Sequence, residues 1–179
     1  MRALAILVFF AHAWVPARAT TLQKLTLGEM VAKSTSIVRA KVTASRTTLR
    51  GSDVYTIYQF ETFETLKGQN GSAPAEVAVP GGIAGSVRQV VAGAPTLLAA
   101  HEYVLFLWTS RSGLTQLMGM SQGLFAVERT APGVVLTTRA AAGEQILDSA
   151  GHAARDEALS MPWAELKAKV TAITAAGSK

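Results

Sequence analysis

Residues 119–123 read Gly-Met-Ser-Gln-Gly, a Gly-x-Ser-x-Gly motif of the kind that carries the nucleophilic serine of α/β-hydrolases. Asp148 and His152 follow Ser121 in the order serine, acid, histidine. Such a serine needs a base within hydrogen-bond reach and a strand-turn-helix context that exposes its hydroxyl. The motif therefore defines one hypothesis, a small serine hydrolase that uses Ser121, Asp148 and His152.

The surrounding sequence favours a glycine-flanked bend between strands over an active site. Apolar and polar residues alternate from Leu124 to Glu128, which is typical of a strand and not of the helix that follows a nucleophilic serine. The chain also lacks the alternating strands and helices of α/β-hydrolases. Asp148 and His152 lie in a weakly patterned segment rich in alanine and glycine, a poor support for a catalytic base. We therefore expect no catalytic residue, and the hydrolase remains an alternative.

Residue types suited to metal or phosphate chemistry are sparse. The chain has no cysteine, which excludes thiolate ligands and disulfide bonds. Beyond residue 19 the histidines are His101 and His152, which are far apart and lack the spacing of paired metal ligands. Pro80-Gly81-Gly82 precedes a loop and not a helix, so it lacks the context of a phosphate-binding loop. The sequence predicts no metal site and no cofactor.

Residues 1–19 have the pattern of a secretory signal peptide. Arg2 is followed by an apolar run from Ala3 to Phe10, and Ala17-Arg18-Ala19 has the small-x-small form of a cleavage site. The apolar run is shorter than the roughly 20 residues that span a bilayer. We therefore expect cleavage after Ala19, a mature chain without a membrane span, and a secreted or periplasmic location.

The charge of the mature chain does not favour nucleic acid as a partner. Loss of Arg2 and Arg18 with the leader lowers the formal net charge from +5 to +3. The other basic residues are scattered, whereas phosphate neutralisation favours a dense positive surface. Tyr55, Tyr58 and Phe60 are the aromatic residues that could stack on bases if they were exposed.

Alternating residues predict two long neighbouring strands within residues 36–68. Val38, Ala40, Val42 and Ala44 alternate with polar residues, which indicates one face in the core and one in water. The alternation of the second strand places Tyr58, Phe60 and Thr62 on one face, and it loses its phase over residues 63–65, where we expect a β-bulge. Gly51-Ser52-Asp53 is the predicted turn. Further strands are predicted over residues 75–79, 102–108, 114–120, 124–128 and 134–138, of which 102–108 is the buried central one.

Two helices flank these strands. Thr26 and Glu29 fit a capping box, which predicts a short helix over residues 27–34. A second helix is predicted to start with Ser160 as its N-cap, and its apolar stripe is expected to dock on the sheet. The stripe consists of Trp163, Leu166, Val170 and Ile173. Residues 139–158 between strands and helix are predicted to be a linker.

The segment that follows the third strand is the candidate binding loop. Proline and glycines at Pro80, Gly81 and Gly82 end that strand, and residues 83–100 then run without a clear period. Loops of this length in a compact domain are usually functional, disordered or partly structured. We select Pro80, Gly81, Gly82, Arg88 and Pro95 as its binding residues, and its aliphatic content predicts that it packs against the sheet.

Several short motifs together resemble a family of uncharacterised bacterial exported domains. They are Ser36-Ile-Val-Arg-Ala-Lys-Val42, Leu66-Lys-Gly68, Val79-Pro-Gly-Gly82, Glu102-Tyr-Val-Leu-Phe-Leu107 and Gly119-Met-Ser-Gln-Gly123-Leu-Phe125. The resemblance covers about residues 22–128, and members often accompany secreted matrixin-like metallopeptidases. It departs from the family at Ala100-His101, where a Gly-acid turn would be usual.

The same motifs more distantly resemble the netrin-like fold of the tissue inhibitors of metalloproteinases. This resemblance implies an OB-like barrel, closed or partly open, of five to seven strands over residues 20–139, followed by the linker and helix of residues 140–179. Those inhibitors bind the zinc of their target through an N-terminal cysteine, and this chain has none. A mature chain that starts at Thr20 retains only an α-amine followed by a hydroxyl.

The sequence thus leaves three function hypotheses. The first is an exported, non-enzymatic protein-binding module whose partner is a secreted metallopeptidase. The second is a metallopeptidase inhibitor that acts through the mature N-terminus. The third is the serine hydrolase with Ser121 as its nucleophile.

Overall fold

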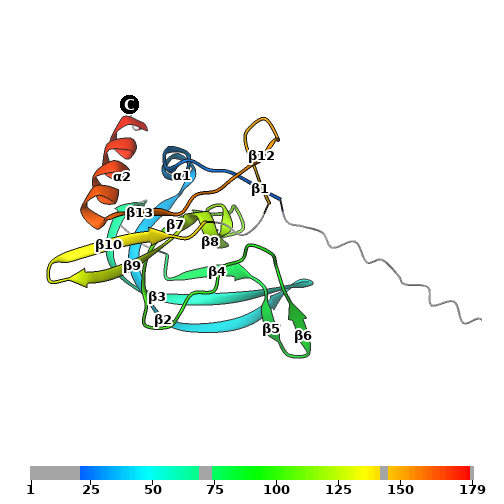
Figure 1. Cartoon of the computed structure of the whole chain (residues 1–179). Helices are drawn as coiled ribbons and strands as arrows, with labels where there is room; N and C mark the ends of the chain where they lie inside the picture. Colours follow the sequence, from blue (N-terminus) through cyan, green and yellow to red (C-terminus); the bar gives the residue numbers. More distant parts are fainter. Residues whose placement is uncertain (1–20, 69–73, 142–144, 178–179) are drawn as a thin grey trace, which may run out of the picture.

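The computed structural model describes residues 21–68, 74–141 and 145–177. It is mainly β with two helices, as predicted (Figure 1). The strands are β1 (Thr21–Gln23), β2 (Ser36–Arg50), β3 (Asp53–Lys67), β4 (Glu76–Pro80), β5 (Gly82–Ala84), β6 (Val87–Gln89), β7 (Glu102–Thr109), β8 (Thr115–Leu117), β9 (Leu124–Ala131), β10 (Val134–Arg139), β11 (Gln145–Leu147), β12 (Ala153–Ala154) and β13 (Leu159–Pro162). The helices are α1 (Leu27–Lys33), the short 3₁₀ helix η2 (Met120–Gly123) and α2 (Trp163–Gly177).

One eight-stranded sheet organises the chain. Its order is β13-β10-β9-β7-β2-β3-β4, and β8 pairs with β7 beside this path. β4 and β8 lie next to each other. Within the described residues no ladder joins β4 to β8 or to β13, so hydrogen bonds do not close the sheet into a barrel.

The β2–β3 hairpin is the longest element and follows the alternation of its sequence. Gly51 has a φ of 64° and turns the chain, as predicted. The register shifts where Leu66 and Phe63 lack a partner on β2, so the expected bulge is confirmed, and a third shift falls at Thr43. Ala44 is exposed, which contradicts its prediction as a core residue, because β2 past this bulge extends beyond the core.

Two buried clusters lie on opposite faces of the sheet. The first contains apolar residues of β2, β3, β4, β7 and β8, together with Leu97 from the loop. The second contains Ile37, Phe106 and Phe125 of the sheet with residues of both helices. The predicted central strand, β7, is buried on both faces because its alternate residues enter the two clusters.

Helix α1 begins with the predicted capping box. The Thr26 hydroxyl accepts the Glu29 N–H at 3.2 Å, and the Glu29 carboxylate accepts the Thr26 N–H at 2.9 Å. At the other end, the Lys67 ammonium donates to the carbonyl of Val31 at 2.6 Å. Partial burial at this contact lowers the pKa of Lys67. Met30 and Val31 are buried, so the helix is fixed at both termini and along one face.

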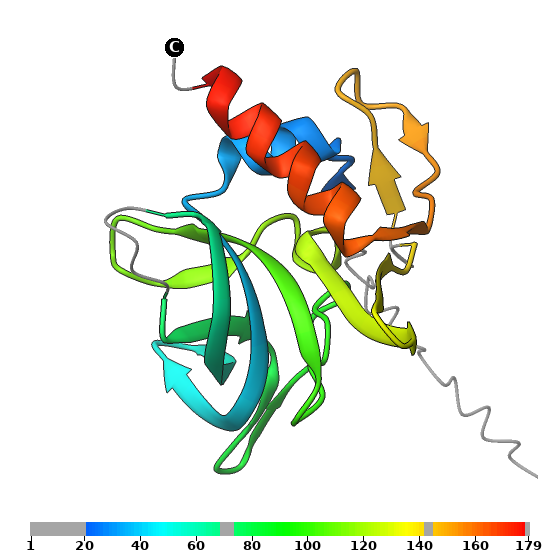
Figure 2. The same cartoon turned by 90° about the vertical axis from the view of Figure 1, so that its left-hand side faces the viewer.

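Helix α2 docks on the sheet through its apolar stripe, as predicted. Leu166 and Val170 are completely buried, and Trp163 and Ile173 pack around them. The guanidinium of Arg39 lies 5.2 Å from the centroid of the Trp163 ring and pairs with the Glu102 carboxylate. Figure 2 shows α2 lying alongside α1 at one end of the molecule.

The segment before α2 differs from its prediction as a linker. It contains β11 and β12, which form a small sheet with β1, and β13, which extends the large sheet. Ser160 lies in β13 and does not cap the helix, which begins at Trp163. The Arg139 and Asp156 side chains form a buried bidentate ion pair, with N–O distances of 2.6 and 2.9 Å. These non-local partners give the segment its structure in the absence of a hydrophobic period.

Candidate functional site

The five residues selected from the sequence as a binding loop come together in the structure. Pro80, Gly81, Gly82, Arg88 and Pro95 all line one pocket of about 320 Å³, which we call the loop pocket. It lies between the end of β4, the β5–β6 hairpin and the loop over residues 90–100. The hairpin lies at the end of the molecule away from the two helices (Figure 1). What the sequence reasoning missed is the hairpin, since β5 and β6 are each three residues long.

Glycine is required at the base of this hairpin. Gly82 has a φ of 133°, and a Cβ there would lie 2.8 Å from Thr56 Oγ1. The neighbouring Gly81 has a φ of 102°; its N–H donates to the Val54 carbonyl at 2.7 Å, and its carbonyl accepts the Thr56 hydroxyl at 2.9 Å. The two glycines therefore let the chain leave β4 sharply while it stays bonded to β3.

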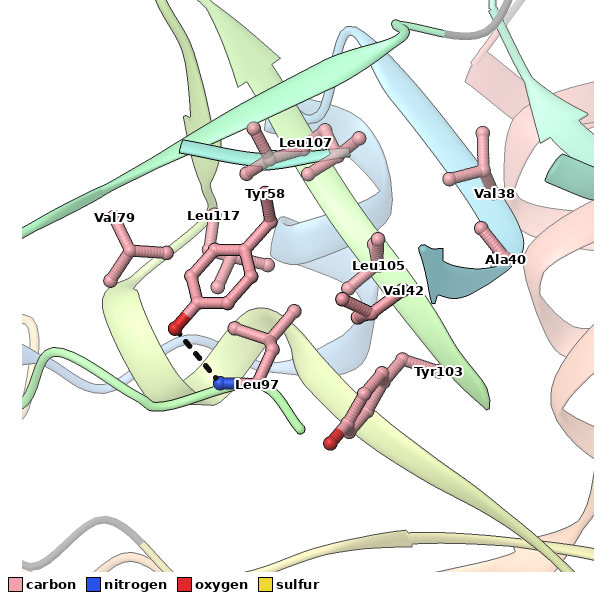
Figure 3. Close-up of a cluster of buried hydrophobic side chains, with 11 residues drawn as sticks. Val38, Ala40, Val42, Tyr58, Val79, Leu97, Tyr103, Leu105, Leu107 and Leu117 are labelled. Atoms are coloured by element: carbon pink, nitrogen blue, oxygen red, sulfur yellow. Dashed lines mark hydrogen bonds between the residues drawn. The ribbon is translucent and has the colours of Figure 1, made fainter. Parts of the chain in front are cut away.

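Two tyrosine hydroxyls hold the loop over residues 90–100. Tyr58 accepts the N–H of Leu97 at 3.3 Å, and Tyr103 accepts the N–H of Leu98 at 3.0 Å. Figure 3 shows the first of these bonds and the Leu97 side chain among the buried residues of the first cluster. The loop is thus fixed by the buried Leu97, by these two hydrogen bonds from backbone N–H groups to tyrosine hydroxyls, and by the Ala100 N–H, which donates to the Val42 carbonyl at 2.9 Å.

Most of the other large aliphatic residues in this region face solvent. The segment was predicted to pack against the sheet through Val87, Val90, Val91, Leu97 and Leu98. Leu97 is buried and Val91 is half-buried, whereas the other three are exposed, so the prediction is wrong for them. Val90 is 81% exposed and Leu98 is 53% exposed. Large exposed apolar residues are also found at Ile83 in the hairpin and at Leu49 near the tip of β2. Of these exposed residues, Ile83 and Val90 line the loop pocket. Exposed apolar side chains at one site are typical of interaction surfaces.

The Gly-x-Ser-x-Gly motif has a structural role. The buried Gln122 side chain accepts the N–H of Leu25 at 2.8 Å and donates to the carbonyl of Gln23 at 3.0 Å. A Cβ on Gly123 would lie 2.5 Å from the carbonyl oxygen of Met118, so only glycine fits there. The motif therefore ties the start of the chain to the turn between β8 and β9.

The structure does not join Ser121 to the other two residues of the supposed triad. The Ser121 hydroxyl is buried and has no hydrogen-bond partner among the described residues. His152 Nδ1 lies 3.5 Å from Asp148 Oδ2, and the His152 side chain is 80% exposed. The pKa of Asp148 is lowered chiefly because its carboxylate accepts the backbone N–H of His152. Asp148 thus shapes the turn between β11 and β12.

The remaining candidate residues lie apart from one another. His101 is exposed beside the start of β7, and its Nδ1 lies 3.0 Å from the carbonyl oxygen of Ala99. Over residues 21–68, 74–141 and 145–177, no three His, Asp or Glu side chains are grouped so that they could hold a metal ion. Tyr58 and Phe60 belong to the first cluster and do not form an exposed stacking face.

The chain is held close to the predicted cleavage site. Thr21–Gln23 forms β1, which pairs in parallel with β11, and the Lys24 N–H donates to the Leu147 carbonyl at 2.8 Å. The predicted leader and Thr20 lie outside the described residues. Among the helices that the structure describes, none combines the length and the apolar character needed to cross a membrane.

Comparison of the chain with protein-family models and with curated protein sequences finds no match in either set. The geometry of the loop pocket and of the Gly-x-Ser-x-Gly residues is therefore the basis for a functional proposal.

Proposed function

We propose that this protein is an exported, non-enzymatic binding module that docks a protein partner at its loop end, which we define as β5, β6 and residues 90–100. The observation that carries this proposal is the exposure of Ile83 and Val90, which both line the loop pocket. An exposed apolar group rimmed by polar residues favours a protein partner. The buried Leu97 and the two tyrosine bonds support the surface from below, so partner binding would require little ordering of the loop.

The proposed partner is a secreted metallopeptidase of the matrixin-like class, and the proposed scaffold is an OB-like barrel with an open seam between β4 and β8. Both rest on the resemblance of the strand motifs in residues 22–128. The adjacent positions of β4 and β8 support the barrel. β4 is the last strand on its side of the sheet, and β8 pairs with β7 in the middle of it, so the two meet only if the sheet curves round on itself. The signal-like leader supports a partner that is itself exported.

Binding to a purified matrixin-like metallopeptidase tests this function. The double variant Val90→Ser, Leu98→Ser removes two exposed apolar side chains, and we expect its affinity to fall at least tenfold in surface plasmon resonance. Val134→Ser is the matched control, because Val134 is 47% exposed but lies at the turn between β9 and β10. Equal affinities for wild type and the double variant would contradict the proposed surface.

A second function, inhibition of a metallopeptidase through the mature N-terminus, is favoured by the pairing of β1 with β11. An amine that binds zinc must be held in place, and this pairing begins at Thr21, next to the expected first residue Thr20. We expect a chain that starts at Thr20 to inhibit, and the same chain with one added alanine before Thr20 to lose inhibition. Equal inhibition by both chains, measured with a fluorogenic peptide substrate, would rule out this mechanism.

A further inference from the structure

The facing edges of β4 and β8 form an unpaired seam in the sheet. β4 pairs only with β3 and β8 pairs only with β7 among the described strands, and the two lie side by side without a ladder between them. Their facing backbone groups therefore have no ladder partner in the part of the chain that the structure describes. Because Cα atoms of the two strands lie within 8 Å of each other, there is no room for a further strand between them, and the seam can admit only side chains.

A cavity of about 190 Å³ opens into this seam, and we call it the seam cavity. β4 contributes Ala78, Val79 and Pro80 to its wall, and β8 contributes Gln116 and Leu117. None of the described residues that line it is charged. A cavity of about 150 Å³ lined by apolar side chains is large enough to hold benzene, so the seam cavity fits one neutral aromatic ring.

The side chains of one tryptophan and one methionine also line the seam cavity. Trp108 lies on β7, and Met120 is at the start of η2. Met120 has a φ of 57°, a conformation that is unfavourable for a residue other than glycine and is frequent at ligand-binding sites. The thioether of methionine adapts readily to aromatic groups. The chain is thus held in a strained conformation at the point where Met120 reaches the cavity.

The seam cavity adjoins the loop pocket, since Val79, Pro80 and Pro95 line both. We propose that the protein partner inserts one aromatic side chain into the seam cavity. This inference rests on the proposed function, because it names the anchor by which the partner would be recognised. Buried aromatic anchors of this kind dominate many protein interfaces.

Binding of N-acetyl-phenylalaninamide, a neutral capped residue, tests whether the seam cavity prefers an aromatic ring. N-acetyl-alaninamide is the control ligand without a ring. In ¹H–¹⁵N NMR spectra of the full chain, we expect saturable shifts at the Trp108 indole and at the amides of Ala78, Leu117 and Met120 with the phenylalanine derivative alone. Equal shifts with both ligands, no saturation, or shifts confined to residues around Arg88 would overturn the proposal.

Two variants of the cavity wall and one control complete this test. Gln116→Trp fills the cavity and is expected to weaken binding of N-acetyl-phenylalaninamide at least tenfold. Met120→Gly, which suits the positive φ and so retains the fold, is expected to weaken it at least threefold. Arg88→Ala changes only the loop pocket and should bind like wild type. Unchanged binding in both cavity variants would overturn the proposal.

The same variants separate this inference from the proposed function. If Val90→Ser, Leu98→Ser abolishes metallopeptidase binding while Gln116→Trp and Met120→Gly bind it normally, the docking surface stands and the aromatic anchor is wrong. If the wild-type chain captures no metallopeptidase but still binds N-acetyl-phenylalaninamide in the seam cavity, the proposed function fails and the preference of the cavity for an aromatic group stands.

Discussion

The two ends of this molecule place their large apolar side chains differently. At the end covered by α1 and α2, Phe106, Phe125 and Leu166 are completely buried. At the loop end, Ile83, Val90 and Leu98 are more than half exposed, and Leu97 is the anchor that reaches the core. The helix end therefore buries its apolar side chains, whereas the loop end leaves apolar surface exposed, and there we propose that a partner docks. Substitutions at the two ends should consequently affect different measurements.

The largest loss of stability is expected when the buried ion pair between Arg139, at the end of β10, and Asp156 is broken. Asp156→Ala leaves the buried Arg139 guanidinium without its carboxylate, which should lower the free energy of unfolding by about 3–5 kcal/mol. Urea denaturation measures this loss. Glu61→Ala breaks the exposed pair of Glu61 with Lys41 and should cost only about 0–1 kcal/mol. Similar losses for both variants would show that burial does not distinguish the two pairs.

Leu166→Ala tests the packing of α2 against the sheet. Because Leu166 is completely buried in the second cluster, we expect a loss of about 2–5 kcal/mol in the free energy of unfolding, measured by thermal or urea denaturation. Binding to the metallopeptidase, measured below the unfolding transition, should not change. Reduced affinity in the folded variant would mean that the helix end takes part in binding.

Thr26→Ala tests the capping box of α1 and should cost about 1 kcal/mol. The pKa of Glu29 is lowered because the Thr26 backbone N–H and then the Thr26 hydroxyl donate to its carboxylate. A lowered pKa means that this contribution is present above the unfolded-state pKa and is lost as the pH falls through the folded-state value. An NMR titration should therefore give Glu29 a higher pKa in the variant. An unchanged Glu29 pKa would contradict the contribution of the hydroxyl.

The smallest stability effect is expected at the loop end. Val90 is 81% exposed, so Val90→Ser should change the free energy of unfolding by no more than about 0.5 kcal/mol, while it weakens partner binding. Parallel denaturation and binding measurements check both expectations. A large loss of stability would place Val90 in the core, and the contrast between the two ends would then disappear.

The sequence by itself determined the elements whose signals are local. Alternation identified β2 and β3 and the bulge at Phe63, because side chains on a strand alternate between its two faces. The capping box at Thr26 was recognisable because its two partners are three residues apart. Pro80, Gly81 and Gly82 were selected for the backbone angles they allow, and the structure brings them together with Arg88 and Pro95 around one pocket.

Only the tertiary structure decided the features that depend on distant partners. β11, β12 and β13 have no pattern of their own, and they form because β1 and β10 offer them strand edges. The exposure of Val90 and the burial of Leu97 could not be distinguished from composition, since Leu97 is buried because its side chain packs among residues of β2, β3, β4, β7 and β8. The seam cavity likewise exists only because the curled sheet brings β4 beside β8 without joining them.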